Sequence, residues 1–373
     1  MLRYILLTQS LILLLLLVTA SEASGQRDCA PDLSQVNLTT HKGFVIPHHP
    51  EVKNLITEHS TAFGICFSRP ARHQGNQWSR HYPESQLGID LLIADLGNTS
   101  VLGHQLSMSP YVDLQLFQTT RLEHRLKMGA GLGYSTKQWD LIENVQNTFI
   151  SSPLSAALSM QTYLNYWISD RFAVSAGMRM THFSNAAYRM PNLGTNMPSA
   201  FLGIIYTGHH RWPSGFEQQY EDTSFTRSLS LRSQGAYCQK EILPPLGKKY
   251  HIATFSTWAD YRVTYKSSLQ LQADVMYNES LPVLIEDSGI ESQSGDAVRL
   301  GIAAGYALHF DVWQLAVQLG AYLKNSYAKS GWMYNRVRVS YDFAERWLAS
   351  IALKTHKTVA DHAEIGIGYR WKN

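Results

Sequence analysis

Segments of about ten residues in which polar and apolar side chains alternate recur along most of this chain. Side chains of a β-strand project to opposite faces in turn, so this pattern predicts strands with one polar and one apolar face. Beyond residue 24, no apolar run approaches the ~20 residues that a membrane-spanning helix needs. We expect strands at residues 61–67, 87–96, 105–117, 124–135, 154–169, 171–184, 199–207, 228–238, 251–265, 268–277, 298–310, 312–324, 334–343, 347–356 and 363–371.

The N-terminus has the features of an export signal. Arg3 supplies a positive charge, a mainly apolar run follows from Ile5 to Val18, and small residues lie around residues 20–24. This order is typical of a cleaved secretory signal peptide, which we predict at residues 1–24. A membrane anchor is the alternative, but the apolar run is short for a spanning helix.

The composition favours a membrane barrel over a soluble secreted β protein. Only 16% of the residues are charged, against about 25% in soluble globular proteins. The chain also contains 20 tyrosines and 9 tryptophans, which suit the aromatic girdles of outer-membrane barrels. We therefore predict an all-β fold, an antiparallel transmembrane β-barrel of roughly 12–16 strands. Its expected location is the outer membrane of a Gram-negative bacterium.

We expect the barrel to occupy residues 61–373. The fifteen segments are an odd number, whereas bacterial single-chain barrels have an even number of strands, so at least one assignment must be wrong. The segment 25–60 leaves three interpretations open, namely a periplasmic lead-in, a plug or an extra strand around residues 43–46.

The end of one predicted strand carries a histidine and a serine two residues apart. His182 and Ser184 project from the same face, which is the minimum geometry for an imidazole to take the proton of a serine hydroxyl. That face is otherwise apolar between Phe172 and Met180, so it faces lipid. The short turn at residues 169–170 is typical of the periplasmic side, which puts Ser184 near the outer leaflet. Polar groups on a lipid-facing surface are costly and therefore indicate function.

The motif extends beyond these two residues. The sequence His-Phe-Ser-Asn-Ala at 182–186, followed by Pro-Asn-Leu-Gly at 191–194, closely resembles the signature of the PagL-type lipid A 3-O-deacylases, the outer-membrane acyloxyacyl hydrolase family. The glycine-rich sequence at 129–134 is also similar to strands of that family. The resemblance covers about residues 85–207, and the remaining sequence is barrel-like without being diagnostic.

The resemblance implies a barrel whose outer surface hydrolyses the ester that joins a 3-hydroxyacyl chain to lipid A of lipopolysaccharide. It implies no metal and no organic cofactor. By matching position, His182 is the general base and Ser184 the nucleophile, while Asn185 and Asn192 contribute to oxyanion binding or to site geometry.

Two positions depart from the family pattern. Asn196 stands where the small PagL enzymes have a glutamate that orients the histidine, and Ala187 stands where they have a glycine. An asparagine can accept a hydrogen bond from an imidazole N–H, as in Cys-His-Asn proteases, but it cannot offset an imidazolium charge. Asn196 is therefore the predicted third catalytic residue, with Glu217 and Glu221 as alternative orienting groups.

The remaining features suggest no other ligand. A formal charge of +3 without a basic run gives no reason to expect nucleic acid as a partner. The expected partners are lipid A and the membrane, and the sequence leaves the oligomeric state open. A non-enzymatic barrel, either a porin or transport channel or an adhesin with long loops, is the competing hypothesis.

Overall fold

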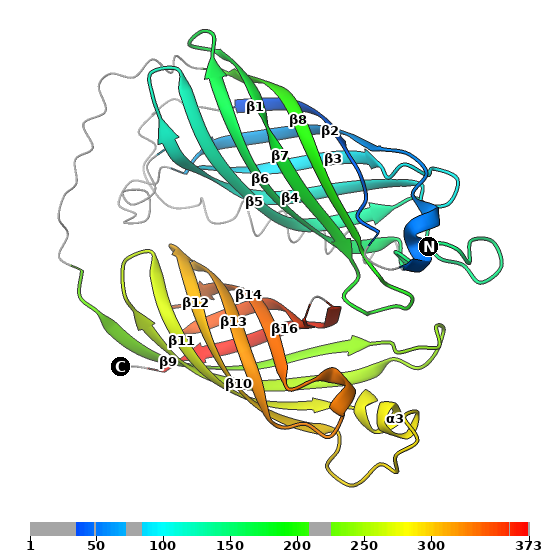
Figure 1. Ribbon diagram of the computed structural model, residues 1–373. Coiled ribbons are helices and arrows are strands. Elements are labelled where there is room, and N and C mark those ends of the chain that lie inside the picture. Colours follow the sequence, from blue (N-terminus) through cyan, green and yellow to red (C-terminus); the bar gives the residue numbers. More distant parts are fainter. Residues whose placement is uncertain (1–34, 48–49, 72–83, 209–224, 358, 372–373) are drawn as a thin grey trace. The chain divides into compact units, whose positions relative to one another are not determined.

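The computed structural model describes residues 35–47, 50–71, 84–208, 225–357 and 359–371. Within these ranges, sixteen strands form two closed antiparallel barrels of eight strands each (Figure 1). No helix in the described part of the chain is long and apolar enough to cross a membrane. The predicted signal peptide at residues 1–24 lies outside the described residues.

The first barrel runs from blue to green in Figure 1. It closes where the last strand pairs with the first, from Gln35 opposite Thr207 to Gly43 opposite Ser199. Its strands are β1 (Gln35–Gly43), β2 (Ser60–Pro70), β3 (Gln86–Asp95), β4 (His104–Gln118), β5 (Leu122–Ser135), β6 (Leu154–Trp167), β7 (Phe172–Ser184) and β8 (Thr195–Thr207), with the 3-10 helix η2 (Pro50–Leu55) between the first two.

The second barrel closes in the same way. Its last strand pairs with its first, from Ile365 opposite Tyr237 to Arg370 opposite Arg232. Its strands are β9 (Ser228–Lys240), β10 (Tyr250–Arg262), β11 (Ser267–Asn278), β12 (Val298–Phe310), β13 (Trp313–Lys324), β14 (Met333–Phe343), β15 (Trp347–His356) and β16 (Val359–Arg370). Helices α3 (Ser280–Glu286) and η3 (Ala328–Ser330) lie in its loops.

The fifteen predicted segments correspond to β2 to β16, and the missing strand is β1. It lies within the segment 25–60, at Gln35–Gly43 and not at residues 43–46. Its outward positions include Thr40 and Lys42, so the apolar alternation is weak there. The all-β, antiparallel barrel class is confirmed. The expected single barrel of roughly 12–16 strands over 61–373 is wrong, since the strands divide into two closed barrels of eight strands each.

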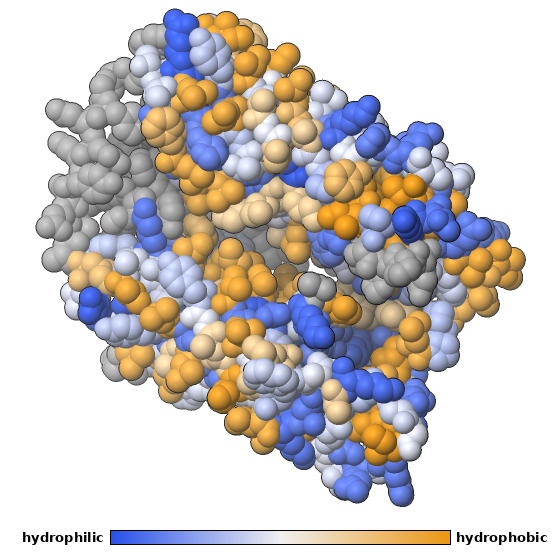
Figure 2. All heavy atoms as spheres, viewed as in Figure 1, coloured by the Kyte–Doolittle hydropathy of each residue, from blue (hydrophilic) through white to orange (hydrophobic). Residues whose placement is uncertain are grey.

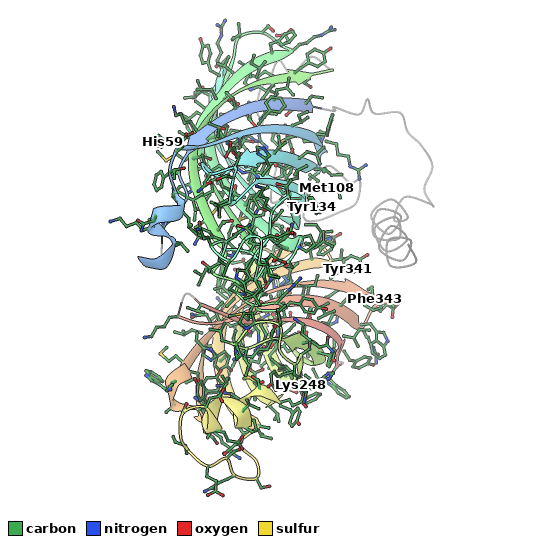
Figure 3. All side chains as sticks on the ribbon, turned by 90° about the vertical axis from the view of Figure 1, so that its right-hand side faces the viewer. His59, Met108, Tyr134, Lys248, Tyr341 and Phe343 are labelled. Carbon is green, nitrogen blue, oxygen red and sulfur yellow. The ribbon has the colours of Figure 1, made fainter. Side chains whose placement is uncertain are left out.

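The strand alternation places apolar side chains outside each barrel and polar ones inside. Orange, hydrophobic side chains are spread over the strands on the face seen in Figure 2. Aromatic rings gather at the short-turn end of the second barrel, where Trp313 lies 4.7 Å from Tyr341 between ring centroids. Tyr341 also stacks near Phe343, and Figure 3 labels both residues. This arrangement is an interfacial aromatic girdle of the kind that membrane barrels have.

Buried charges fill the interior of the first barrel. Asp90 on β3 accepts hydrogen bonds from Arg179 on β7 and Lys127 on β5, both at 3.0 Å. A second group joins Arg125 to Asp113 at 3.0 Å, and Tyr163 donates to the same carboxylate. The Asp90–Arg179 contact joins β3 to β7 across the barrel, because an eight-stranded barrel is only wide enough for its side chains. The Arg125–Asp113 contact joins the neighbouring strands β5 and β4.

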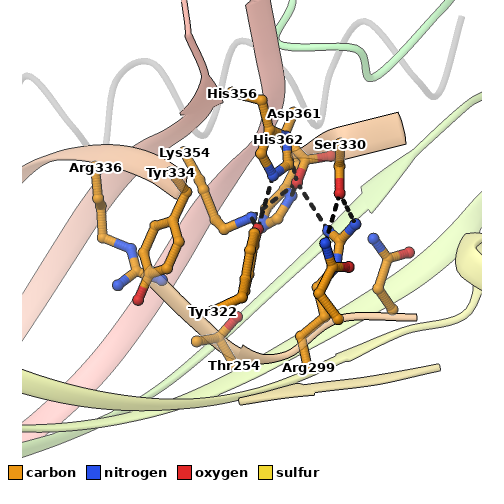
Figure 4. A network of polar contacts seen from close by, with 12 residues as sticks. Thr254, Arg299, Tyr322, Ser330, Tyr334, Arg336, Lys354, His356, Asp361 and His362 are labelled. Carbon is orange, nitrogen blue, oxygen red and sulfur yellow. Dashed lines mark hydrogen bonds and ion pairs between the residues drawn. The ribbon is translucent and has the colours of Figure 1, made fainter. Parts of the chain in front are cut away.

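The second barrel contains a separate polar network, part of which is drawn in Figure 4. Arg336 donates to Asp274 at 2.8 Å and lies 3.1 Å from Glu364. Nearer the loops, Asp361 accepts from Lys240 at 2.6 Å and from Lys354 at 2.9 Å. Charged groups buried in this way persist only when they are paired.

We predict that Asp90→Asn destabilises the first barrel by about 3–5 kcal/mol, because Arg179 and Lys127 lose their shared carboxylate while remaining buried. Urea unfolding in detergent, followed by tryptophan fluorescence, measures the change. Glu143→Gln removes a charge from an exposed loop position of the same barrel and serves as the control. Equal stability of the two variants would contradict the predicted role of Asp90.

Candidate active site

Ser184 is the last residue of β7, at the end of the first barrel opposite the short β4–β5 and β6–β7 turns. The alternation of β7 turns Phe183 into the interior, where it is fully buried in an apolar cluster, and turns His182 and Ser184 outward. Met178, two positions before Met180 on the same outer face, is 71% exposed. Ser184 itself is only 7% exposed because it lies beneath the adjoining loops.

His182 is oriented by a residue on the neighbouring strand. It lies opposite Asn196 in the β7–β8 register, and its Nδ1 is 2.7 Å from the Asn196 Oδ1. Because a carbonyl oxygen only accepts hydrogen bonds, this contact requires the proton on Nδ1. Nε2 is then the ring atom with a lone pair that can take a proton, as general-base chemistry needs.

The Ser184 hydroxyl oxygen accepts two hydrogen bonds from N–H groups. Asn192 donates to it from Nδ2 at 2.9 Å, and the backbone N–H of Ala186 donates at 3.1 Å. The Oδ1 of Asn192 in turn accepts from the backbone N–H of Asn185 at 3.1 Å, which fixes the orientation of the Asn192 amide. Donors grouped around a nucleophilic oxygen also lie next to the position where an oxyanion forms during acyl transfer.

A second loop, residues 136–153 between β5 and β6, supports this arrangement. The side-chain amide of Asn185 donates to the Ser152 hydroxyl at 3.1 Å and to that of Ser151 at 3.3 Å. The backbone N–H of Gly194 donates to the Phe149 carbonyl at 2.9 Å. Asn185 therefore connects two loops and is occupied in holding the site together.

Within the same loop, the backbone N–H groups of Glu143 and Ile142 lower the pKa of the Asp140 carboxyl by donating hydrogen bonds to it. No sequence motif indicates the supporting role of this loop, because its contacts with the β7–β8 loop depend on the pairing of β6 with β7.

Three residues of the β7–β8 loop have left-handed backbone conformations. The φ angles are +53° at Ala186, +61° at Ala187 and +71° at Gly194. A Cβ atom at Gly194 would lie 3.1 Å from the Cε1 atom of His182, so glycine lets the backbone approach the imidazole closely. Ala187 has a side chain in a conformation that glycine adopts without strain.

The structure thus brings His182, Ser184, Asn192 and Asn196 together at one end of the first barrel. Asn185 lies beside them with its side chain directed to the supporting loop. The alternative orienting residues Glu217 and Glu221 lie outside the described residues. No group of three or more His, Cys, Asp or Glu side chains in the described part of the chain is arranged to hold a metal ion.

Comparison with protein families adds an independent observation. A family model described as "Lipid A 3-O-deacylase (PagL)" matches residues 70–204, and one described as "Acyloxyacyl hydrolase, C-terminal domain" matches residues 223–373. The chain belongs to the PagL family. The first match runs from the end of β2 into β8, and the second takes in all of β9 to β16, so the two matches fall on different barrels.

Several solved structures are similar to this PagL-family chain. "Crystal structure of the outer membrane enzyme PagL" is 16% identical, covers 45% of this chain and 97% of its own, and has a TM-score of 0.32. Neisserial surface protein A is 11% identical. The match covers 47% of this chain and 96% of that protein, with a TM-score of 0.30. OccAB4 of Acinetobacter baumannii is 8% identical. The match covers 92% of this chain and 98% of that protein, with a TM-score of 0.24. No curated protein matches the chain.

Membership of the PagL family supports a hydrolase located in the outer membrane of a Gram-negative bacterium. It also extends the family likeness beyond the region 85–207 that the motifs suggested, because the second barrel matches a family model of its own.

We predict opposite effects at two left-handed positions of the PagL-type loop. Gly194→Ala should cost about 1–2 kcal/mol of barrel stability, because alanine is strained at a φ of +71° and its Cβ crowds His182. Ala187→Gly relieves the same kind of strain and should leave stability unchanged or raise it by up to about 1 kcal/mol. Urea unfolding in detergent compares the two, and losses of equal size would refute the backbone argument.

Proposed function

We propose that this chain is an outer-membrane serine esterase that removes an ester-linked 3-hydroxyacyl chain from lipid A of lipopolysaccharide. The observation that carries the proposal is the outward-facing Ser184 hydroxyl, held by the N–H donors of Asn192 and Ala186 on a strand that also presents His182. The family to which the chain belongs supports lipid A as the substrate and an ester as the bond that is cleaved.

The position of Ser184 suits a substrate that is itself a membrane component. Ser184 lies at the strand end nearest the long loops, which face outward in barrels of this type. An acyl ester of lipid A occurs at the boundary between headgroup and hydrocarbon, where a polar site costs less than at mid-bilayer. The ester can therefore approach Ser184 laterally from the outer leaflet.

In the first half of the proposed reaction, the Ser184 Oγ attacks the ester carbonyl carbon while His182 Nε2 takes the hydroxyl proton. Asn196 keeps the remaining imidazole proton on Nδ1. The Asn192 amide and the Ala186 backbone N–H stabilise the oxyanion of the tetrahedral intermediate. Cleavage of the carbon–oxygen bond releases the sugar hydroxyl, which receives its proton from His182, and leaves an acyl-enzyme.

In the second half, a water molecule attacks the acyl-enzyme carbonyl and gives a proton to His182. Breakdown of the second tetrahedral intermediate returns that proton to Ser184 and releases the 3-hydroxy fatty acid. All the proposed groups come from the β7–β8 hairpin, so the chemistry needs no residue of the second barrel.

The described interiors of both barrels disfavour the channel hypothesis. Arg179 and Asp90 pair across the first lumen, and Arg336 and Asp274 pair across the second, with each side chain no more than 1% exposed. A porin needs a larger barrel to leave an aqueous passage, whereas eight strands enclose only their own side chains.

We predict that Ser184→Ala abolishes loss of the 3-hydroxyacyl chain when the purified protein is incubated with lipopolysaccharide and lipid A mass is followed. Ser155→Ala is a matched control on the adjacent strand, because the Ser155 hydroxyl is buried and makes no hydrogen bond in the structure. Unchanged lipid A with the folded parent protein would overturn the proposed activity, and full activity of Ser184→Ala would exclude this nucleophile.

We predict that Asn196→Asp raises kcat by about tenfold near neutral pH, because a carboxylate of the same size stabilises the imidazolium that forms on His182. Asn196→Leu, which keeps the bulk but removes the acceptor, should lower kcat with little change in KM. Initial rates across a pH series measure both effects. Equal rates for the three proteins would mean that Asn196 has no role in orienting the histidine.

A further inference from the structure

The outer surface of the second barrel contains an apolar groove with a volume of about 760 Å³. It lies where β16, β9, β10 and β11 are neighbours, and its size is within the range of about 300–1,000 Å³ typical of small-molecule sites. The side chains around it are almost all apolar and outward-facing. They include Tyr237, Phe255, Val275, Ile365 and Ile367, and the backbone of Gly235 also lines the groove.

The groove exists because small residues interrupt the apolar wall. Gly235 lies between Ile367 on β16 and Phe255 on β10, and a Cβ atom at this glycine would meet no atom within 4 Å. Ala253 occupies the position next to Tyr237 in the β9–β10 register. Larger side chains would therefore fit at these two positions. The groove is open because the residues there are small, and not because the strands are held apart.

A polar rim borders the groove on the side of the long loops. Tyr237 forms a hydrogen bond of 2.6 Å with the Nδ1 of His251, and the side-chain amide of Gln239 donates to the tyrosine hydroxyl at 3.2 Å. Beyond them, Lys248 pairs with Glu279 at 2.7 Å while remaining 60% exposed (labelled in Figure 3).

The rim carboxylate stays ionised. The backbone N–H of His251 and the Lys248 ammonium donate hydrogen bonds to Glu279 and lower the pKa of its carboxyl. The exposed Lys248 ammonium has three donors, so it can engage a phosphate oxygen while it keeps its contact with Glu279. An apolar groove below a polar rim that contains an exposed ammonium has the polarity profile of a lipid, with acyl chain and headgroup at opposite ends.

We propose that this groove binds an acyl chain of a lipid A molecule in the outer leaflet, with the phosphorylated headgroup at the Lys248 rim, as a second lipid site on the chain. The surface faces hydrocarbon in an outer-membrane barrel, so an acyl chain is the occupant that the medium supplies. The rim lies at the long-loop end, which faces outward. The identity of the lipid rests on the proposed function, whereas the presence of the site does not.

The test uses full-length protein carrying Ser184→Ala, so that binding is measured without turnover. Lipid A with a photoreactive acyl chain is cross-linked in detergent, and the labelled peptides are identified by mass spectrometry. We expect labelling of peptides from residues 228–262 and its loss in Gly235→Phe, which fills the groove. Val317→Phe adds the same ring to an exposed outer position of β13 and should keep the labelling.

Competition and substitution experiments distinguish lipid A from other molecules that could fill the groove. Excess unlabelled lipid A should compete and phosphatidylethanolamine should not, and Lys248→Gln should weaken labelling by phosphorylated but not by dephosphorylated lipid A. Labelling that Gly235→Phe leaves unchanged, or that phosphatidylethanolamine removes equally well, would overturn the proposal. Cross-links between two copies of the chain through residues 235–255 would also overturn it. Deacylation by the parent protein is scored separately, so failure of one proposal does not imply failure of the other.

Discussion

Closure of each sheet on itself is the constraint on which the rest of this structure depends. Pairing of β8 with β1 and of β16 with β9 leaves neither sheet with a free edge. In hydrocarbon, every unpaired backbone N–H or C=O group costs several kcal/mol, so a spanning sheet must close. Once eight strands have closed, alternate side chains must face either lipid or a narrow interior. The positions of buried charges and of lipid-facing polar residues follow from that division.

The interiors show one consequence. Each barrel places carboxylates and cations inside, and the narrow lumen forces them into contact, as with Asp90 and Arg179 in the first barrel and Asp274 and Arg336 in the second. These pairs join strands that are distant in the sheet. Because the charged groups pair inside each barrel, the outward-facing side chains are left to contact lipid.

The outer surfaces show the other consequence. A polar group that faces lipid needs hydrogen-bond partners from its own chain, and Ser184 obtains them from Asn192 and Ala186. On the second barrel, Tyr237 and His251 satisfy each other in a similar way. Both groups lie on the long-loop side of their barrels, where the polar headgroup region lowers the cost of exposing them. A PagL-type reaction on a membrane lipid requires such a surface, because its substrate does not leave the bilayer.

The sequence by itself determined the strand periodicity, fifteen of the sixteen strands, and the outward direction of His182 and Ser184, because these depend on local alternation. The sequence motif also pointed to Asn196, whose contact with His182 follows from the pairing of the consecutive strands β7 and β8. Only the tertiary structure decided that the strands close as two barrels, since closure depends on pairing between β1 and β8 and between β9 and β16, which are far apart in the chain. The same holds for the loop that supports Asn185 through Ser151 and Ser152, because long-range contacts leave no periodic trace in the sequence.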